Sequence, residues 1–225
     1  MKSRLAFILT SILLALTLFS FAAMWVISNT TAGRVWQLTN AQRHCIQEVT
    51  DNPVYVEEQR DIDSVAVGYL INDDFYVAIF DVSHNGRCRP IFQEKVWHLE
   101  IFGAGTSYAK KDDIRPQKIR LLRLTNSPDP VIYIWFDILG VGKRTNAKHI
   151  FFAKQKDNSY QSILLLKLCV GLSSVEITEQ IPPTIMVIDD RQCDWPPSNE
   201  RDYLEYSLWD EQPVILRAWS TGRFR

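Results

Sequence analysis

Residues 65–80 read VAVGYLINDDFYVAIF, two β-rich runs separated by the polar triplet 72–74. The first run alternates larger and smaller residues, whereas the second run, 75–80, is apolar on both faces. A short polar break between two such runs is typical of a β-hairpin. A strand that is apolar on both faces is expected inside a sheet, because an edge strand would expose one of them. The stretch therefore predicts a hairpin whose second strand has a neighbour on each side.

Similar strand signals follow along the rest of the chain, at intervals of roughly 8–14 residues. In the segment 203–209 the apolar residues Leu204, Tyr206 and Leu208 share one face, which is the pattern of a half-buried strand. Many short strands with turn residues between them predict a mainly β domain, built as a sandwich, a barrel or a blade-like array. The other candidate strands are 96–102, 118–124, 131–138, 149–153, 161–168, 184–188 and 214–219.

One internal similarity bears on the choice between these architectures. Strand-like runs end at Asp81, Asp137 and Asp189, and each aspartate is followed by a polar loop and another strand. A period near 50 residues can mark propeller blades, but a closed propeller needs at least about four of them. Chance similarity among ordinary hairpins explains the spacing equally well, so we infer no family from it.

The N-terminal segment Leu5–Ile27 is a run of residues without a charge, preceded by Lys2 and Arg4. As a helix it would be roughly 34 Å long, enough to cross a hydrocarbon core of about 30 Å. We expect a single-pass signal-anchor, because the run is longer than the apolar part of an ordinary cleaved signal. The alternative is a cleaved signal, with cleavage after Ala22 or Ala32, which would make the protein secreted.

The charges that flank this segment predict its orientation. Lys2 and Arg4 precede the span and favour a cytoplasmic N-terminus, so the C-terminal domain is expected to be extracytoplasmic. We divide the chain into an anchor (1–27), a juxtamembrane connector (28–49) and an extracytoplasmic β-rich domain (50–225). The connector contains the one other predicted helix, 33–49.

All four cysteines lie beyond the apolar run, an even number that suits two disulfides in an exported domain. We expect Cys169–Cys193 as the local pair, because it closes a short loop, and Cys45–Cys88 by elimination. The alternative is four buried thiols in a cytosolic domain.

The composition of residues 28–225 restricts the partners of the domain. This part contains all 26 acidic residues and every basic residue except Lys2 and Arg4, which gives a formal charge of −3. A nucleic-acid-binding domain would need a concentrated basic face, so we expect no nucleic-acid partner. The remaining candidate partners are the membrane, through Leu5–Ile27, and a protein or a glycan.

The sequence contains no complete catalytic, cofactor-binding or metal-binding motif. Gly103 and Gly105 have no third glycine at 108, where a dinucleotide-binding loop would place it. The Gly140–Lys143 segment lacks the first glycine and the Ser or Thr of a phosphate-binding loop. The acidic loop around Asp189 is more simply a solvated surface than a calcium site, since calcium requires six or more oxygens. We therefore expect no cofactor and name no catalytic or metal-binding residue.

The tryptophans give one candidate interaction residue. Trp195 lies in the turn-rich stretch CDWPP, residues 193–197, outside any alternating pattern, whereas most of the others lie in apolar strands and are expected in the core. The leading hypothesis is a membrane-anchored, extracytoplasmic binding or assembly module of unknown ligand. The alternatives are an exported hydrolase acting on envelope polysaccharide, and a structural envelope protein without a discrete ligand.

Overall fold

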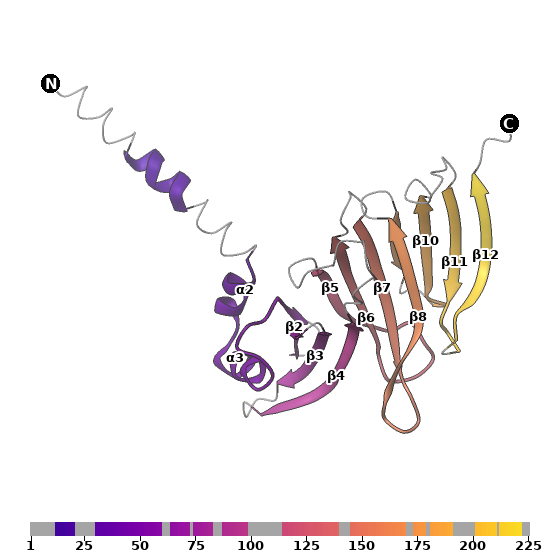
Figure 1. The fold of residues 1–225 in the computed structure, drawn as a ribbon, viewed down its shortest axis with the longest axis horizontal. Coiled ribbons are helices and arrows are strands. Elements are labelled where there is room, and N and C mark those ends of the chain that lie inside the picture. The colour runs from indigo at the N-terminus through magenta and orange to yellow at the C-terminus, as the bar shows by residue number, and fades with distance from the viewer. Residues whose placement is uncertain are drawn as a thin grey trace, which may run out of the picture.

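The protein is mainly β, and its described strands form three four-stranded antiparallel sheets. Figure 1 shows the sheets stacked in chain order, with helices α2 and α3 at one end of the stack and strand β12 at the other. The computed structural model describes residues 12–20, 30–59, 64–72, 74–82, 87–98, 114–139, 145–169, 173–178, 181–190, 201–210 and 212–221.

Within the predicted anchor Leu5–Ile27, the structure describes residues 12–20. These residues are helical, and their large apolar side chains are exposed. The other residues of the predicted anchor lie outside the described part of the chain. Among the residues that are described, no helix is both long enough and apolar enough to cross a membrane.

The connector forms two short helices, α2 (Thr31–Gln37) and α3 (Asn40–Gln47), instead of the single predicted helix 33–49. The break comes at Thr39, whose extended backbone (φ −64°, ψ 161°) makes it the N-cap of α3. Gln42 N donates to Thr39 Oγ1 at 3.2 Å, and Thr39 N donates to Gln42 Oε1 at 2.9 Å. This capping box satisfies backbone donors that a continuous helix would have bonded internally.

Sheet 1 contains the predicted hairpin. Its strands are β1 (Tyr55–Gln59), β2 (Ser64–Ile71), β3 (Asp74–Val82) and β4 (Cys88–His98), paired in that order. Asn72, in the turn between β2 and β3, has the left-handed φ of 54° that tight hairpin turns require. β3 pairs with β2 on one side and β4 on the other, so the predicted position of this strand inside a sheet is confirmed.

Sheets 2 and 3 repeat the same four-stranded meander. Sheet 2 consists of β5 (Ile114–Leu122), β6 (Val131–Leu139), β7 (Thr145–Lys154) and β8 (Tyr160–Cys169). Sheet 3 consists of β9 (Ser174–Thr178), β10 (Thr184–Asp190), β11 (Arg201–Ser207) and β12 (Val214–Thr221). Three consecutive meanders confirm the predicted mainly β domain, which is built from three four-stranded antiparallel sheets.

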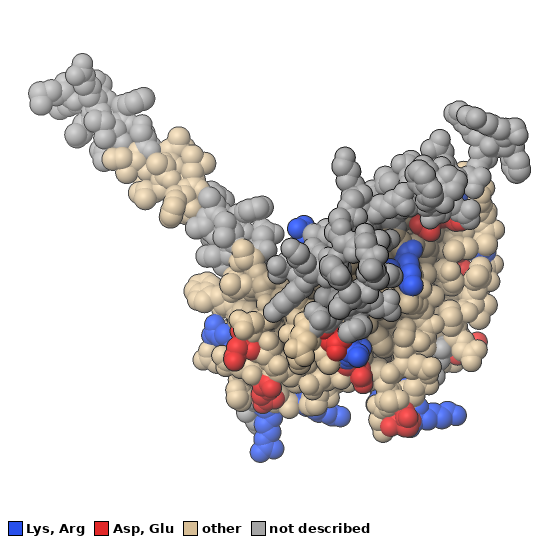
Figure 2. Space-filling view, in the orientation of Figure 1, with Lys and Arg blue, Asp and Glu red and all other residues tan. Residues whose placement is uncertain are grey.

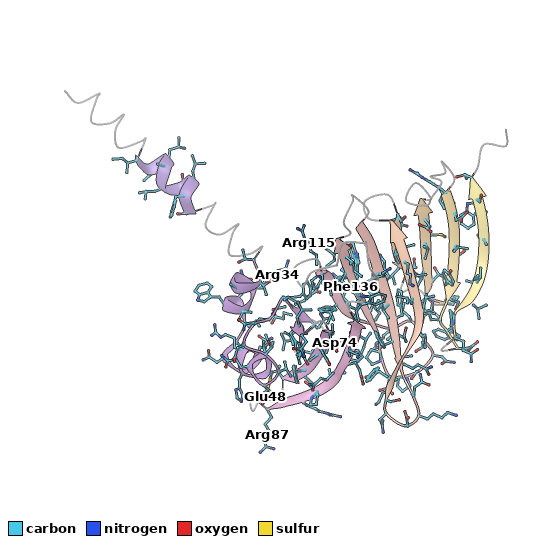
Figure 3. All side chains as sticks on the ribbon, viewed as in Figure 1. Arg34, Glu48, Asp74, Arg87, Arg115 and Phe136 are labelled. Carbon is cyan, nitrogen blue, oxygen red and sulfur yellow. A yellow bond between two sulfur atoms is a disulfide. The ribbon has the colours of Figure 1, made fainter. Side chains whose placement is uncertain are left out.

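Three apolar layers hold the stack together. The first joins sheet 1 to sheet 2, and there Phe136 packs against Phe75 at a ring distance of 5.3 Å and against Trp97 at 5.8 Å. Figure 3 labels Phe136 within this layer. The second joins sheet 2 to sheet 3, and the third joins sheet 1 to α2 and α3. Sheets 1 and 2 are therefore covered on both faces.

Side chains of β1 also close the edge of β5. Glu57 Oε2 accepts from Ile119 N at 3.1 Å, and Gln59 Nε2 donates to Ile119 O at 2.7 Å. These bonds occupy backbone groups of β5 that face away from β6, its one partner among the described strands. The first strand of sheet 1 is thus polar along one side because it pairs with a second sheet through its side chains.

Several predicted boundaries were wrong. β4 begins at Cys88, not at residue 96, and β1 and β9 were not predicted as strands. The aspartate period does not mark equivalent positions either, because Asp81 lies on the third strand of its sheet, whereas Asp137 and Asp189 lie on second strands. The predicted buried face of segment 203–209 is confirmed, since Leu204, Tyr206 and Leu208 all contribute to the layer between sheets 2 and 3.

Candidate functional site

Sheet 3 ends the stack, and its two faces have different surroundings. Ile185 and Val187 of β10 point into the layer shared with sheet 2. Because side chains alternate along a strand, the residues between them point the other way. No outward-facing residue of sheet 3 belongs to any of the three layers formed by the described residues. We call this outward-facing surface the end face.

Two rows of side chains cross the end face from β9 to β12. The strand register defines an apolar row with a stacked aromatic pair, Tyr203 and Trp219, whose rings are 5.1 Å apart and inclined by 6°. A second row places Arg217 beside Glu205 at 3.5 Å. In full, the apolar row is Ser174, Ile188, Tyr203 and Trp219, and the charged row is Glu176, Met186, Glu205 and Arg217.

Strand β12, at the right of Figure 1, is exposed along its whole length. The exposed fractions of Val214, Ile215, Leu216 and Trp219 are 52%, 54%, 49% and 42%. Large apolar side chains on an edge strand are a liability for a free protein, since the strand offers unpaired backbone groups as well. Their concentration on β12 therefore marks this end of the molecule as a contact surface.

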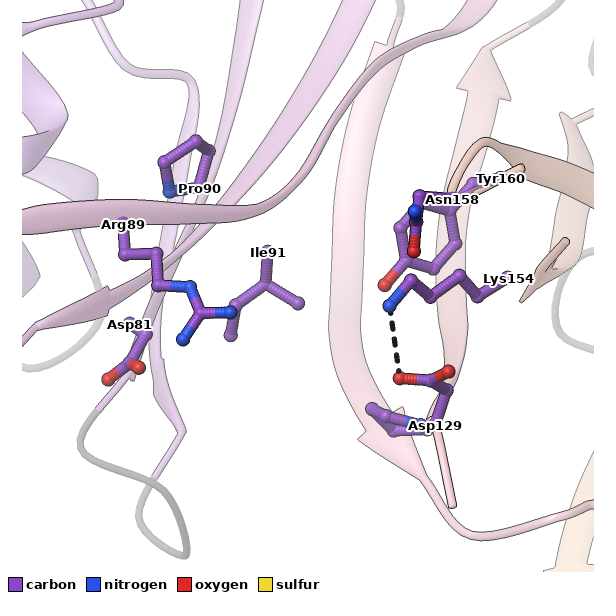
Figure 4. A pocket seen from close by; sticks show the side chains of 9 residues that line it. Asp81, Arg89, Pro90, Ile91, Asp129, Lys154, Asn158 and Tyr160 are labelled. Carbon is purple, nitrogen blue, oxygen red and sulfur yellow. Dashed lines mark hydrogen bonds and ion pairs between the residues drawn. The ribbon is translucent and has the colours of Figure 1, made fainter. Parts of the chain in front are cut away.

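A second feature is a cavity of about 390 Å³ between sheets 1 and 2. In Figure 4, Arg89 and Asp81 form one wall, and Lys154, Asp129 and Tyr160 form the other. Lys154 Nζ lies 3.3 Å from Asp129 Oδ1, so the positive and negative charges of these two side chains neutralise each other. The raised pKa of Tyr160, caused by burial and by the nearby Asp129, keeps its hydroxyl protonated.

The lining of this cavity argues against a ligand pocket of the usual kind. Four of its nine lining residues are charged, and its apolar part is limited to Pro90, Ile91 and Pro130. Most small-molecule sites have a predominantly apolar wall with a few polar groups. Both signs of charge are present in equal number, so no net charge selects an anion or a cation. Figure 2 likewise shows basic and acidic side chains interspersed over the described part of the face it presents.

A buried polar cluster on sheet 2 has a structural explanation. The Tyr133 hydroxyl lies 2.7 Å from His149 Nδ1, and the His149 ring stacks on Trp135 at 5.2 Å. Burial lowers the pKa of His149 to about 4, so the ring is neutral near pH 7. Both groups are less than a tenth exposed. The cluster therefore packs and satisfies two polar side chains rather than presenting them to a substrate.

Two more buried ionisable groups in sheet 2 also have partners. Asp137 accepts from Trp135 Nε1 at 3.2 Å and from Gln117 Nε2 at 3.0 Å, although burial raises its pKa. Lys148 lies 5.4 Å from the centre of the Trp97 ring, and burial, together with the charge of Lys167, lowers its pKa to about 8. These contacts give each group a role in the packing of the sheet.

The residues singled out from the sequence have different outcomes. Cys45 on α3 and Cys88 at the start of β4 form the predicted disulfide, with a Cα–Cα distance of 5.3 Å. Cys193 and Trp195 lie outside the described residues, so the Cys169–Cys193 pair and the interaction role of Trp195 stay predictions. The described part of the chain contains no group of three or more His, Cys, Asp or Glu residues that could hold a metal ion.

The end face was missed from the sequence because Trp219 was assigned to the core. Trp36 was also expected there, and it is 71% exposed. The available signal was the stretch 214–219, in which the apolar run 214–216 precedes Arg217 without the alternation that segment 203–209 shows. A strand that is apolar on both sides but lies at an edge is unusual for a core element, and it is typical of a contact surface.

Comparison with known proteins adds no relative. The chain matches no protein family. It also matches no curated protein and no solved structure.

Proposed function

We propose that this protein is a binding or assembly module held on the extracytoplasmic side of a membrane, and that its end face makes the contact. The observation that carries the proposal is that every residue of β12 is exposed, with the large apolar side chains of Val214 and Trp219 on the end face. Sheets 1 and 2 have both faces covered, whereas sheet 3 offers an apolar surface to a partner. Macromolecular contacts of this kind depend on aromatic and arginine side chains, which Trp219 and Arg217 supply.

The location in this proposal has two supports. The charge-free segment Leu5–Ile27, with Lys2 and Arg4 before it, is the pattern of a single-pass anchor with a cytoplasmic N-terminus. The Cys45–Cys88 disulfide suits an oxidising compartment, because such bonds are rare in the reducing cytosol. In this proposal residues 1–27 form the anchor, 28–49 the connector and 50–225 the extracytoplasmic domain.

The location is tested by reporter fusions after Arg225. A reporter that is active only outside the cytoplasm should give signal, and one that is active only inside should be silent. The reverse pattern would overturn both the location and the disulfide argument. Replacing Leu5–Ile27 by a cleavable export signal should release the domain from the membrane fraction.

The contact role is tested by a photoreactive amino acid at position 219 of the full chain. We expect a discrete cross-linked product in intact cells, because Trp219 is 42% exposed on β12, the edge strand of the end face. The matched control carries the same group at Gln161, an exposed residue of β8 on sheet 2. Equal labelling at both positions, or no discrete product from position 219, would contradict the proposal.

Trp195 is a further proposed contact residue. Pro196 and Pro197 would stiffen the loop that presents it, which lowers the entropy cost of holding an indole for a partner. Trp195→Ala should then weaken the cross-link from position 219 while leaving the thermal midpoint nearly unchanged. If Trp195 caps the core instead, the same substitution should cost about 3–5 kcal/mol of folding stability.

A further inference from the structure

We propose that the occupant of the end face is a second copy of this chain, bound through a two-fold axis that runs parallel to the strands between β10 and β11. This inference deepens the proposed function and rests on it. It names the partner that the contact surface takes. The argument depends on which end of the stack is open, on the charge pattern of the end face and on its size.

Of the two ends of the stack, only the sheet 3 end is left uncovered by the residues that the structure describes. The outer face of sheet 1 is covered by α2 and α3, and Cys45 and Ile46 of α3 are 0% and 2% exposed in that layer. A head-to-tail contact would need sheet 3 of one copy to meet the outer face of sheet 1 of the next, and the helices occupy that position. An isologous contact, in which the same face meets itself, is the arrangement that brings two open sheet faces together.

The charged row is self-complementary about the proposed axis. Rotation about an axis parallel to the strands does not change the position of a row along the strands, so each row faces the same row of the second copy. It reverses the strand order, so β9 faces β12 of the second copy. Arg217 at one end of the row then meets Glu176 of the second copy, and the pair occurs twice. The Arg217 side chain is 77% exposed and lies 3.5 Å from Glu205 of its own chain, so in the dimer it would bridge that carboxylate and the exposed Glu176 of the second copy.

The neighbouring row fits the same operation. Ile188 of β10 meets Tyr203 of the second copy, and both side chains are half-buried in the single chain. The exposed Trp219 meets Ser174, a small residue that leaves room for an indole. In the charged row Glu205 lies opposite Met186 of the second copy and keeps its ion pair with Arg217, so the interface combines apolar contacts with paired charges. Two stacked sheets of this kind cross at about 30°, which long side chains at the edges accommodate.

The size of the end face predicts a weak, reversible dimer. The four strands contain five to eight residues each, about seven on average. At about 4.8 Å between strands and about 3.3 Å per residue, the face spans roughly 19 Å by 23 Å. Two copies would cover about 900 Å² of projected area, which is less than the roughly 1,600 Å² of a standard stable interface. Anchoring both copies in one membrane would raise their effective concentration and favour the contact.

A charge exchange in the full chain tests the inference. Dimerisation is followed by energy transfer between labelled copies in lipid vesicles, as a function of the protein-to-lipid ratio. Arg217→Glu alone and Glu176→Arg alone each place two like-charged pairs in the dimer, and we expect each to raise the dissociation constant at least about tenfold. The double variant restores opposite charges between the copies, but position 217 then lies beside Glu205 of its own chain with a like charge. It should therefore dimerise more tightly than either single variant without reaching the affinity of the original chain.

The matched control reverses Glu94 and Arg123, which are exposed residues away from sheet 3. These changes alter net charge in the same way and should leave the dissociation constant unchanged. All variants keep the N-terminal segment, so any association through that segment contributes equally to each dissociation constant and does not affect the comparison. Circular dichroism and thermal melts check that each variant is folded.

Three outcomes would overturn the inference. The first is a chain that stays monomeric at every protein-to-lipid ratio. The second is a dimer that tolerates both single reversals, because its interface then lies elsewhere. The third is a double variant that fails to recover although it is folded. If the chain is monomeric but the cross-link from position 219 persists, the partner is another molecule, and the proposed function stands without this inference.

Discussion

The side-chain amide of Gln59 pairs with the backbone of Ile119 as a strand would, its Nε2 donating to the carbonyl oxygen at 2.7 Å. Its Oε1 accepts from Leu121 N at 3.4 Å, so one side chain occupies two consecutive outward groups of β5. Sheets 1 and 2 are joined here by hydrogen bonds as well as by apolar packing. Removal of this amide is therefore a direct test of the contact between the two sheets.

Gln59→Ala should lower the free energy of unfolding by about 1–2 kcal/mol, because it leaves a backbone carbonyl and an amide of β5 without a partner. Urea unfolding of the full chain in detergent measures the loss. The control is Gln161→Ala on the exposed side of β8, which should change stability by less than about 0.5 kcal/mol. Equal losses in the two variants would contradict the role of Gln59.

Gly68→Ala should destabilise the protein by about 1–3 kcal/mol through overpacking. A Cβ at this position would lie 3.0 Å from Phe75 Cε2 and 3.3 Å from Tyr55 Cβ, and Phe75 is fully buried. Phe75→Leu removes the ring, so Gly68→Ala should cost less in that background. A double-mutant cycle measures this coupling, and an identical cost in both backgrounds would show that the ring is not the obstacle.

The protein should lose stability between about pH 6.5 and pH 4 because of His149. Its pKa is lowered to about 4 in the fold, so the unfolded chain binds the proton first as the pH falls. The loss approaches about 3 kcal/mol at the lower limit. Unfolding free energies at pH 7.5 and pH 4.5 should differ less in His149→Gln than in the original chain.

The exposed His44, 66% accessible on α3, provides the control for this pH effect. His44→Gln should keep the full pH dependence. Lys148 does not confuse the comparison, since its lowered pKa of about 8 places its own loss of stability above the pH range used. A pH dependence that survives in His149→Gln would assign the effect to other groups.

Reduction of the Cys45–Cys88 bond should cost about 2–4 kcal/mol, because the bond closes a loop across a sequence separation of 43 residues. The double variant Cys45→Ala/Cys88→Ala should lose that sensitivity to reductant. If Cys169 pairs with Cys193 as predicted, thiol titration of the denatured, unreduced protein should find no free thiol. A result of two titratable thiols would be consistent with the Cys45–Cys88 bond and would exclude the Cys169–Cys193 bond.

Local sequence patterns predicted the strands whose buried and exposed sides follow from neighbours within the same sheet. The β2–β3 hairpin and the buried face of β11 were readable because turn residues and alternation are local signals. β1 and β9 were missed because they are short and their exposed positions carry polar residues. The polar Glu57 is explained by its contacts with Ile119 and Arg120 of β5, which are distant in the sequence.

The candidate site was harder to predict for a related reason. Whether Trp219 is buried depends on whether a further layer covers sheet 3, and alternation within β12 does not contain that information. The Cys45–Cys88 pair could be predicted because four cysteines allow few disulfide pairings. The stacking order of the sheets could not, since it depends on the shapes of whole faces rather than on any single segment.

The disulfide between α3 and β4 also determines how the chain would carry tension. A pull between the N-terminal helices and sheet 3 passes along the chain to Cys45, crosses the bond to Cys88 and continues toward the C-terminus. The residues between these cysteines, which include β1, β2 and β3, lie outside that load path. An intact bond therefore shields three strands of sheet 1 from mechanical unfolding, and its reduction would expose them to the full force.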